Sequence, residues 1–577
     1  MNALRILVAI IMCGLIGVGV YWMSGQESEG GYRIPVPTDG VVAEFQGEDE
    51  GHADRRREWI ELMHRSDRGV DWRQVEMENA FRRHQVRRGL AVRGGGDEVF
   101  ANGHLAGEWK ELGSTDQAGS VINTLYDAAT DEIYLISAAG SLWKGKRDGS
   151  EWTVVNQDLR FNEGVLEWIP KAGGRRMVAF IGRIPHYSDD DGQTWTAATG
   201  ISYTDSWGAF HSPVVVADSG IIYVLAKKDY WSNIRLYRSA DYGETYQWFG
   251  TMTTSNFDNY RMFSPQGSDE VFLLQRSSVD TRVYQIDHSQ PALVLLNKDE
   301  TLTLGEARAN LAGYVTDSVP TLFIYRQTPG ENPGLYVSTN LGATWEKRGE
   351  LPARPWGVGV YVTPSNPDVM FLGEVECYRS DDGGANWVRI NQWWEYYDAP
   401  ATMLHADMMH FAEFETANGN PFLLVSNHGG LSISENGGIS MENIALSGLN
   451  VSQYYSLKSS PAAPYLFFGG SQDQGFQRGV TLGEGPFQMK QLISGDYGHI
   501  AFSKGGNRLW TVYPGGWVIV YDKLTDNGHS ASWEMNSLNE SVWIPPLHET
   551  GNPQEDAILM AGGHIDGSEG SHLVRLT

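Results

Sequence analysis

A short turn motif recurs along the chain, and its regular spacing restricts the fold more than any other feature. The motif has the form Ser-x-Asp/Asn-x-Gly, ends in most copies with an aromatic residue, and starts at Ser188, Ser239, Ser338, Ser380 and Ser434. Successive starts differ by 51, 99, 42 and 54 residues, so the longest interval holds one further, degenerate repeat near residues 282–296. A period of about 40–55 residues is typical of the four-stranded blades of a β-propeller.

Each copy of this motif, an Asp-box, has a mechanical role. The Asp or Asn side chain is expected to accept hydrogen bonds from its own turn, the Gly to take a positive φ, and the aromatic ring to pack beside neighbouring strands. The motif therefore predicts a stapled hairpin and not a catalytic element. The residues with this predicted structural role are Asp190, Gly192, Trp195, Asp241, Gly243, Asn340, Gly342, Trp345, Asp382, Gly384, Trp387, Asn436 and Gly438.

Weaker copies extend the series at residues 142–152, 485–492 and 518–533. Residues 572–577 resemble the third strand of a blade, and 104–113, with Trp109 in the box position, resembles a fourth strand that would complete it. Such closure would hide the exposed edges of the first and last sheets. The count predicts an all-β fold, a single large propeller of ten blades over residues 96–577.

Composition supports this fold and narrows the function. The chain has 67 Gly and 66 aromatic residues (20 Trp, 26 Tyr and 20 Phe), which favours short strands and tight turns. A net charge of −27 argues against a nucleic-acid partner, since a phosphate-binding surface needs clustered Lys and Arg. The two cysteines, Cys13 and Cys377, are not expected to pair, because Cys13 lies in the N-terminal apolar run.

The N-terminal region predicts attachment to a membrane. Residues 4–23 are almost wholly apolar and long enough to span about 30 Å of hydrocarbon, so 1–24 is predicted to be a transmembrane anchor, with a cleaved signal as the alternative. Residues 25–51 are predicted to be a linker and 52–95 a helical spacer of two short helices. The membrane would be contacted through 4–23, and the body would be extracytoplasmic, in the periplasm or at the cell surface.

The region from residue 405 to about 502 resembles a known family. The runs at 405–414, 426–438, 447–457, 465–475 and 495–502 are similar to the sortilin-type, BNR-repeat bacterial proteins often labelled glycosyl hydrolases, and more distantly to xyloglucanase-type propellers. The resemblance implies a ten-bladed propeller with a wide tunnel that takes peptides. His428 departs from it, because such proteins usually have Asp before this Gly-Gly pair.

The resemblance raises two enzymatic alternatives. Arg183-Ile184-Pro185 matches the Arg-Ile-Pro of sialidases, but it lies only five residues before a box, on the strand entering that hairpin, so a sialidase is not expected. Glycoside hydrolysis needs two facing carboxylates, about 5–9.5 Å apart. The candidates are Glu374, Glu376, Asp407, Asp473 and Asp496, of which Asp407, Asp473 and Asp496 are the predicted catalytic residues. All of these side chains could instead satisfy strand-end backbone groups.

Histidines accompany these carboxylates, and His405, His410, His428, Gln472 and His499 are the candidate binding residues. On one strand, residues 405 and 407 would point to one face and 410 to the other, so the three would not ligate a metal together. No metal and no cofactor is predicted. The sequence therefore favours a membrane-anchored, extracytoplasmic binding and assembly module for a protein, peptide or glycan, held through the tunnel and its upper loops. The alternative is a glycoside hydrolase acting on polysaccharide.

Overall fold

The computed structural model describes most of the chain from Ile60 onward. The larger ranges beyond that point that are not described are 65–68, 93–97, 101–104, 108–111, 202–213, 228–231, 253–259, 300–310, 327–332, 354–357, 535–542 and 562–572. The predicted anchor at 1–24 and linker at 25–51 lie outside the described residues. The chain divides into two compact units, residues 1–43 with 61–110, and residues 44–60 with 111–577.

The first unit contains helix α3, Trp72–Val92, and a two-stranded hairpin of β1, Glu98–Phe100, and β2, Leu105–Gly107. Asp71 caps the helix, because its Oδ1 accepts a hydrogen bond of 2.9 Å from the backbone N–H of Arg73. The sequence predicted two short helices; α3 runs for 21 residues, and Ile60, Glu61 and Met63 ahead of it are also helical. Among the described residues, no helix combines the length and the apolar character needed to cross a membrane.

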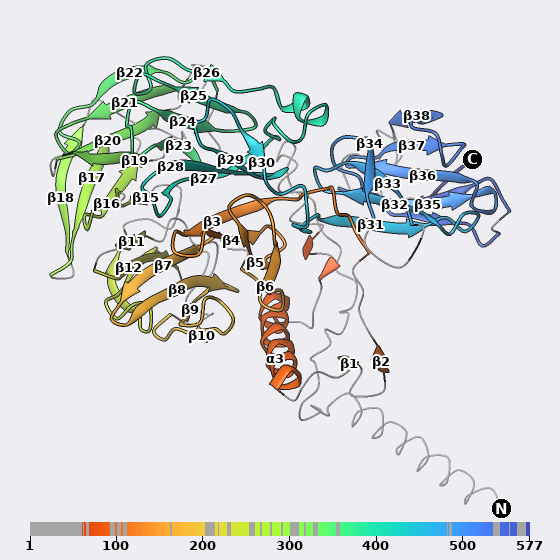
Figure 1. The fold of residues 1–577 in the computed structure, drawn as a ribbon, viewed down its shortest axis with the longest axis horizontal. Helices are drawn as coiled ribbons and strands as arrows, with labels where there is room; N and C mark the ends of the chain where they lie inside the picture. The colour runs from red at the N-terminus through yellow and green to blue at the C-terminus, as the bar shows by residue number, and fades with distance from the viewer. Residues whose placement is uncertain are drawn as a thin grey trace, which may run out of the picture. The chain divides into compact units, whose positions relative to one another are not determined.

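The second unit begins with seven four-stranded antiparallel sheets, each made of consecutive strands (Figure 1). The first three sheets are β3–β6 (Val121–Asp127, Glu132–Ser137, Leu142–Lys146, Thr153–Asn156), β7–β10 (Leu166–Lys171, Gly174–Ile181, Ile184–Ser188, Thr196–Ala197) and β11–β14 (Val214–Val216, Ile221–Ala226, Arg235–Ser239, Gln247–Thr251). The next two are β15–β18 (Tyr260–Phe263, Phe272–Arg276, Thr281–Asp287, Ala292–Asp299) and β19–β22 (Leu311–Thr316, Val319–Arg326, Gly334–Ser338, Glu346–Glu350). The last two are β23–β26 (Gly359–Val362, Met370–Gly373, Cys377–Ser380, Val388–Arg389) and β27–β30 (Met408–Glu415, Pro421–Asn427, Gly430–Ser434, Glu442–Asn443).

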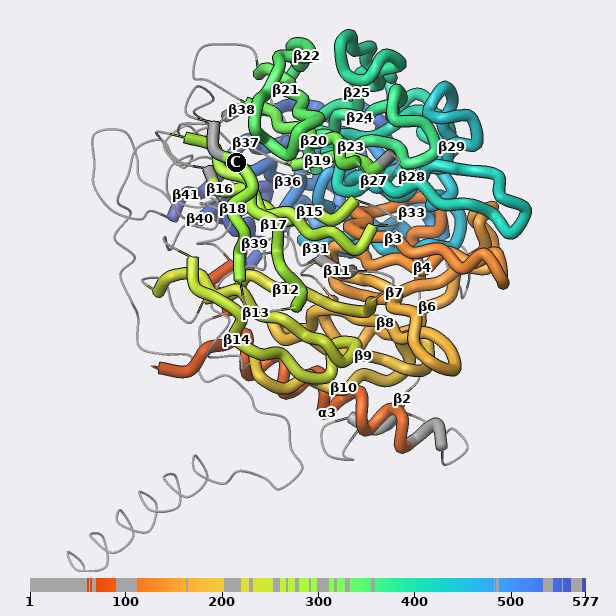
Figure 2. Tube along the Cα trace, turned by 90° about the vertical axis from the view of Figure 1, so that its left-hand side faces the viewer, coloured from red at the N-terminus to blue at the C-terminus, as the bar shows by residue number. Residues whose placement is uncertain are grey.

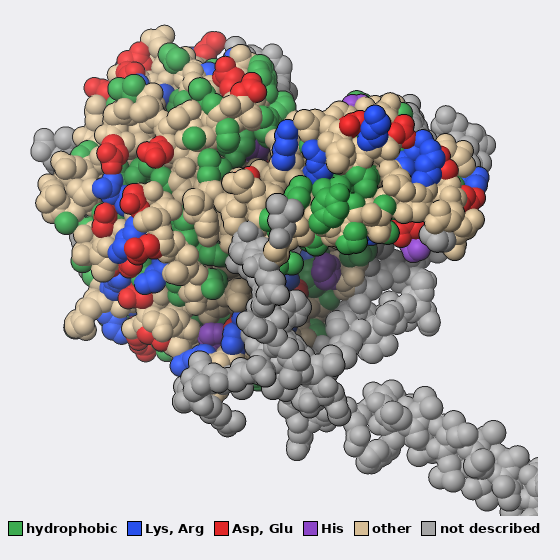
Figure 3. Space-filling model, turned by 45° about the vertical axis from the view of Figure 1, so that its right-hand side comes forward, with side chains coloured by type: hydrophobic (Ala, Val, Ile, Leu, Met, Phe, Trp, Pro, Cys, Tyr) green, Lys and Arg blue, Asp and Glu red, His purple; other side chains and the backbone are tan. Residues whose placement is uncertain are grey.

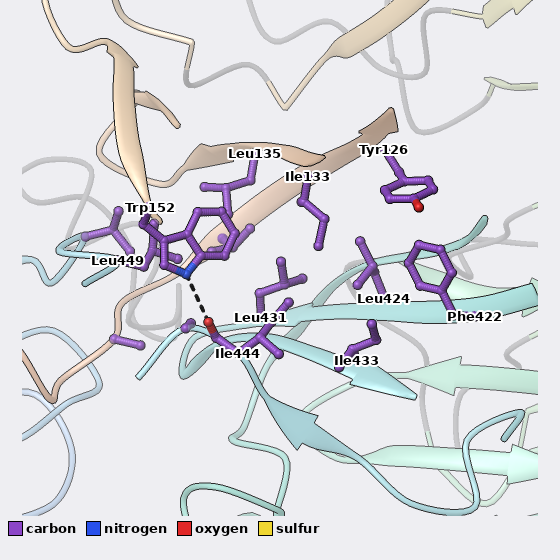
Figure 4. Packing of buried hydrophobic residues seen from close by; sticks show 14 residues of the cluster. Tyr126, Ile133, Leu135, Trp152, Phe422, Leu424, Leu431, Ile433, Ile444 and Leu449 are labelled. Atoms are coloured by element: carbon purple, nitrogen blue, oxygen red, sulfur yellow. Dashed lines mark hydrogen bonds between the residues drawn. The ribbon is translucent and has the colours of Figure 1, made fainter. Parts of the chain in front are cut away.

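The seventh sheet packs against the first, and this closes the series into a ring. Tyr126 of β3 meets Phe422 of β28 edge-on, with ring centroids 4.8 Å apart (Figure 4). The Trp152 indole N–H donates a hydrogen bond of 3.0 Å to the Ile444 carbonyl. Buried residues of both sheets form one apolar cluster, and Figure 2 draws β3 and β4 beside β28. The prediction of one ten-bladed ring was therefore wrong in its closure, because seven sheets already bury both end faces.

Three further sheets, which we call the second stack, follow the ring. They are β31–β34 (Tyr454–Ser459, Leu466–Ser471, Phe476–Val480, Met489–Ile493), β35–β38 (Ile500–Ser503, Arg508–Tyr513, Trp517–Tyr521, Ala531–Glu534) and the three-stranded β39–β41 (Leu547–Glu549, Ile558–Ala561, Leu573–Leu576). Two apolar clusters join neighbouring sheets of this stack. The predicted closing strand at 104–113 does not pair with β41 in the part that is described, since Leu105–Gly107 pairs with β1, and Trp109 lies outside the described residues.

The predicted Asp-boxes form hydrogen-bonded turns between the third and fourth strands of their sheets. In the first box, Ser188 Oγ donates to Asp190 Oδ1 at 2.8 Å and accepts from the Gly192 N–H at 2.9 Å. Asp190 Oδ1 also accepts from the backbone N–H of Thr194 at 2.8 Å, and the Trp195 indole donates to the Gly192 carbonyl at 2.8 Å. The serine, carboxylate or amide, and glycine bonds recur in the other four copies. The boxes therefore stabilise hairpins, as their sequence indicates.

Candidate functional site

Three side chains from the ring and the second stack meet at one point, which we call the junction site. Asp407 directly precedes β27, His428 lies in the turn between β28 and β29, and Asp473 lies in the turn between β32 and β33. His428 Nδ1 is 3.0 Å from Asp407 Oδ2 and 2.8 Å from Asp473 Oδ2. The three side chains retain between 14% and 21% of their exposure, so solvent can reach them.

Backbone geometry holds both carboxylates in place at some cost. Asp407 and Asp473 have φ values of 67° and 60°, in the left-handed region that costs a non-glycine residue about 1–2 kcal/mol. The Asp473 N–H donates a hydrogen bond of 3.0 Å to Asp496 Oδ1, and Gln474 Nε2 donates one of 2.9 Å to the His428 carbonyl. Strained non-glycine residues concentrate at functional sites, where the surrounding structure enforces them.

His428 and Asp473 shift each other's pKa values through their contact. Burial alone would lower the pKa of His428, but the contacts with Asp407 and Asp473 outweigh it and raise that pKa to about 10. Burial would raise the pKa of Asp473, but the neighbouring His428, His405 and Gln472 lower it below its usual value. At neutral pH His428 is therefore protonated beside an ionised Asp473, a state in which Asp473 does not donate a proton.

A buried aromatic pair lies beside this cluster. The Tyr397 hydroxyl contacts His405 Nε2 at 3.1 Å and donates to the Asp473 carbonyl at 3.3 Å. Burial lowers the pKa of His405 and raises the pKa of Tyr397. His405 is therefore a neutral hydrogen-bonding group at pH 7 that helps to position Tyr397 against the turn carrying Asp473.

The remaining predicted site residues lie in different surroundings. Asp496 accepts the Asp473 N–H, and Gln472 accepts a hydrogen bond of 3.3 Å from the Tyr455 hydroxyl, so both support the Asp473 turn. His410 lies on β27, where burial lowers its pKa to about 4, and His499 directly precedes β35, where burial and Lys458 lower its pKa. These two histidines do not contact Asp407, His428 or Asp473 through any hydrogen bond or ion pair that the described residues show.

Glu374 and Glu376, which follow β24, have different surroundings. Glu376 forms an ion pair of 2.6 Å with Arg389, which occupies its carboxylate. Glu374 has its pKa raised, mainly by burial, and its backbone carbonyl accepts the Met408 N–H at 2.9 Å. The turn carrying Glu374 therefore lies next to Asp407 in the backbone network.

A cavity of about 660 Å³ lies between the ring and the second stack, beside the junction site. Tyr397 lines it and also contacts Asp473, so the cavity and the site share this residue. The other lining residues are Asp116, Gln117, Tyr396, Pro400, Leu446, Arg478, Val480, Gln488, Met489, Lys490 and Gln491. Aromatic, amide, charged and apolar groups are thus mixed in the lining of this cavity.

The sequence interpretation missed Tyr396 and Tyr397. Both belong to the 3-10 helix η4, Trp393–Tyr397, whose sequence Trp-Trp-Glu-Tyr-Tyr interrupts the blade pattern between β26 and β27. An aromatic run placed outside a repeating unit indicates a task other than blade packing. The exposed Trp393 and Trp394 of the same helix, at 37% and 49%, agree with that interpretation.

The sialidase-like tripeptide does not contribute to the junction site. Arg183 lies in the turn between β8 and β9 with a φ of 69°, on the second sheet of the ring and not on a strand as expected. The face drawn in Figure 3 shows Lys and Arg side chains interspersed with Asp and Glu. A broad cationic surface of the kind that binds phosphate backbones is not evident on that face.

The sheets and their turns define an all-β propeller protein. Among solved structures the chain is similar to the GH74 enzyme of Niastella koreensis, with a TM-score of 0.46 and 14% identity over 77% of this chain and 76% of that one. It is also similar to YCF48 bound to D1 peptide (TM-score 0.36, 14% identity, 58% and 96% coverage) and to YCF48 from Cyanidioschyzon merolae (TM-score 0.39, 11% identity, 57% and 98% coverage). No family model matches the chain, and no curated protein does.

Proposed function

We propose that this protein is a binding module that holds a segment of a protein or a glycan in the cavity between the ring and the second stack. The observation that carries the proposal is the mixed lining of that cavity next to the strained junction site. A rigid propeller frame presents both, and preorganised surfaces bind with a smaller entropic loss. The cavity takes the place of the tunnel expected from the sequence.

The chemistry of the lining fits an extended polar polymer. Tyr396 and Tyr397 line the cavity with aromatic rings, and the exposed Gln488 offers an amide donor and acceptor. Gln117 and Gln491 offer their amide oxygens, since their Nε2 groups already donate to backbone carbonyls. The exposed Lys490 adds a positive charge, and Val480 adds an apolar contact. Sugar rings and peptide backbones both use such a combination of stacking and amide hydrogen bonds.

A glycoside hydrolase remains the second candidate because one observation favours it. The donor atoms of Asp407, His428 and Asp473 all lie within 4.8 Å of one another, near the separation of about 5–5.5 Å between the carboxyls of retaining glycosidases. However, His428 contacts both carboxylates, and the low pKa of Asp473 removes it as a general acid. Among the carboxyls predicted from the sequence, Glu374 is the one with a raised pKa, as a general acid requires.

The location of the protein belongs to the same proposal. The apolar run at 4–23 supports a membrane-anchored body that acts outside the cytoplasm, in the periplasm or at the cell surface. A binding module at that location would meet polymers of the envelope or the exterior. Fractionation of cells, with and without residues 1–24, tests this part, and a body that stays cytoplasmic with the segment present would contradict it.

The binding proposal is tested with the full chain in detergent against arrays of oligosaccharides and of peptides. For any ligand found, Val480→Arg and Lys490→Glu should weaken binding at least about 10-fold, because both change the exposed lining of the cavity. Leu457→Arg is the matched control, since Leu457 is 53% exposed on β31 but does not line the cavity. Binding that survives both lining variants would refute the site, and two empty arrays would refute the function.

Measuring enzymatic turnover distinguishes the glycoside hydrolase from the binding module. The same chain is incubated with polysaccharides and the release of reducing ends is measured, together with a Glu374→Gln variant checked for folding. Hydrolysis that is lost in the folded variant would replace the binding module with an enzyme. Binding without hydrolysis in both chains would support the binding module.

A further inference from the structure

We infer that the junction site binds a divalent first-row transition-metal ion, such as Mn²⁺ or Zn²⁺, through Asp407 Oδ2, His428 Nδ1 and Asp473 Oδ2. The ion would join the ring to the second stack, because the first two ligands belong to one and the third to the other. This inference does not depend on which polymer the adjacent cavity holds.

Distances and hydrogen bonding both support a metal ligand set. Around an octahedral ion with bonds of about 2.1 Å, adjacent ligand atoms are about 3.0 Å apart. The observed separations from His428 Nδ1 are 3.0 Å to Asp407 Oδ2 and 2.8 Å to Asp473 Oδ2. His428 Nδ1 and Asp473 Oδ2 are buried atoms in contact at 2.8 Å, yet neither meets the geometry of a hydrogen bond with any described residue. Buried polar atoms without hydrogen bonds are rare, and a bound ion is one accepted explanation.

The charges also fit. Two carboxylates converge in a site that is about four-fifths shielded from solvent, where negative charge without a partner is costly. A divalent ion balances both carboxylates. A bound ion would also explain the positive φ of Asp407 and Asp473, since each strained turn directs one carboxylate oxygen to the same point.

The ligand types select the class of ion. Imidazole nitrogen is preferred by transition metals, whereas Mg²⁺ and Ca²⁺ prefer oxygen alone. Three protein ligands leave further coordination positions on the ion, which water or a group bound in the cavity could fill. The cavity is close enough for this, because Tyr397 lines it and also contacts the Asp473 carbonyl.

The test is metal binding by the purified full chain after chelation. Equilibrium dialysis against Mn²⁺ or Zn²⁺, followed by elemental analysis, should give about one ion per chain, with little retention of Mg²⁺ or Ca²⁺ at the same concentration. Co²⁺ should give visible absorption bands that report its coordination. Asp407→Asn, Asp473→Asn and His428→Ala should each weaken binding by about 100-fold or more, whereas His499→Ala, a histidine outside the site, should not.

The asparagine variants keep the shape of each side chain, so the test stands even if His428→Ala fails to fold. Melting curves with and without Mn²⁺ provide a second measurement, in which only chains with an intact site should gain melting temperature. Absence of a stoichiometric ion from the wild-type chain, or equal binding by wild type and both asparagine variants, would overturn the inference.

Discussion

The closure of the ring between its first and seventh sheets can be tested by a double-mutant cycle. Tyr126 and Phe422 belong to sheets separated by almost 300 positions in the sequence, yet their rings lie 4.8 Å apart at 86°, the edge-to-face geometry. Both are buried, at 8% and 3% exposure. Aromatic pairs of this kind contribute about 0.5–1.5 kcal/mol beyond the area they bury.

We predict that Tyr126→Leu and Phe422→Leu each lower the free energy of unfolding by about 1–3 kcal/mol, and that their effects are coupled by about 1 kcal/mol in the double variant. Urea unfolding followed by tryptophan fluorescence gives the four free energies. Tyr126→Leu combined with Phe272→Leu, a buried change on the fourth sheet, is the control and should be additive within about 0.5 kcal/mol.

In a single ring of ten blades, Tyr126 and Phe422 would lie far apart. Their substitutions would then be additive, just as in the control pair. Additivity of the Tyr126 and Phe422 changes, with both single variants clearly destabilised, would refute closure after seven sheets.

Three further predictions concern individual residues. Gly384→Ala should destabilise by about 2–4 kcal/mol, because φ is 86° and a Cβ would lie 2.4 Å from a buried Leu335 carbon, while Gly419→Ala, at a φ of 76° in open space, should cost only about 1 kcal/mol in thermal melts. His186, 2% exposed, has its pKa lowered to about 4 by burial, so the fold should lose about 3 kcal/mol relative to His186→Gln as pH falls from 6.5 to 4; equal acid sensitivity of the two chains would contradict this. Cys377, buried with a raised pKa, should react with a thiol reagent only after unfolding, and rapid reaction of the native chain would show that its burial is wrong.

The sequence predicted the sheets better than their arrangement. The Asp-box is a local signal, since every bond of the Ser188 turn lies within eight residues, and it therefore located each hairpin correctly. Which sheets become neighbours depends instead on side-chain packing between distant segments. The contact of Trp152 with the Ile444 carbonyl has no counterpart in the repeat pattern.

The candidate site was predicted residue by residue but not as a cluster. Asp407, His428 and Asp473 were each singled out, and the strand alternation that argued against a joint role for His405, Asp407 and His410 does not apply, because β27 begins only at Met408. The left-handed turns of the two aspartates and the position of the second stack decide the convergence, and neither follows from residue type.

The polypeptide chain enters and leaves the seven-sheet ring at the same place. A Cβ on Gly119 would lie 2.3 Å from the Val451 carbonyl oxygen, and Ser452 Oγ donates a hydrogen bond of 2.8 Å to the Gln117 carbonyl. Every sheet of the ring is also made of consecutive strands. The seven-sheet ring is therefore a continuous stretch of chain whose two ends lie side by side. It could be excised, transplanted, or circularly permuted at an exposed turn such as the one at Gly419, with every strand pairing preserved.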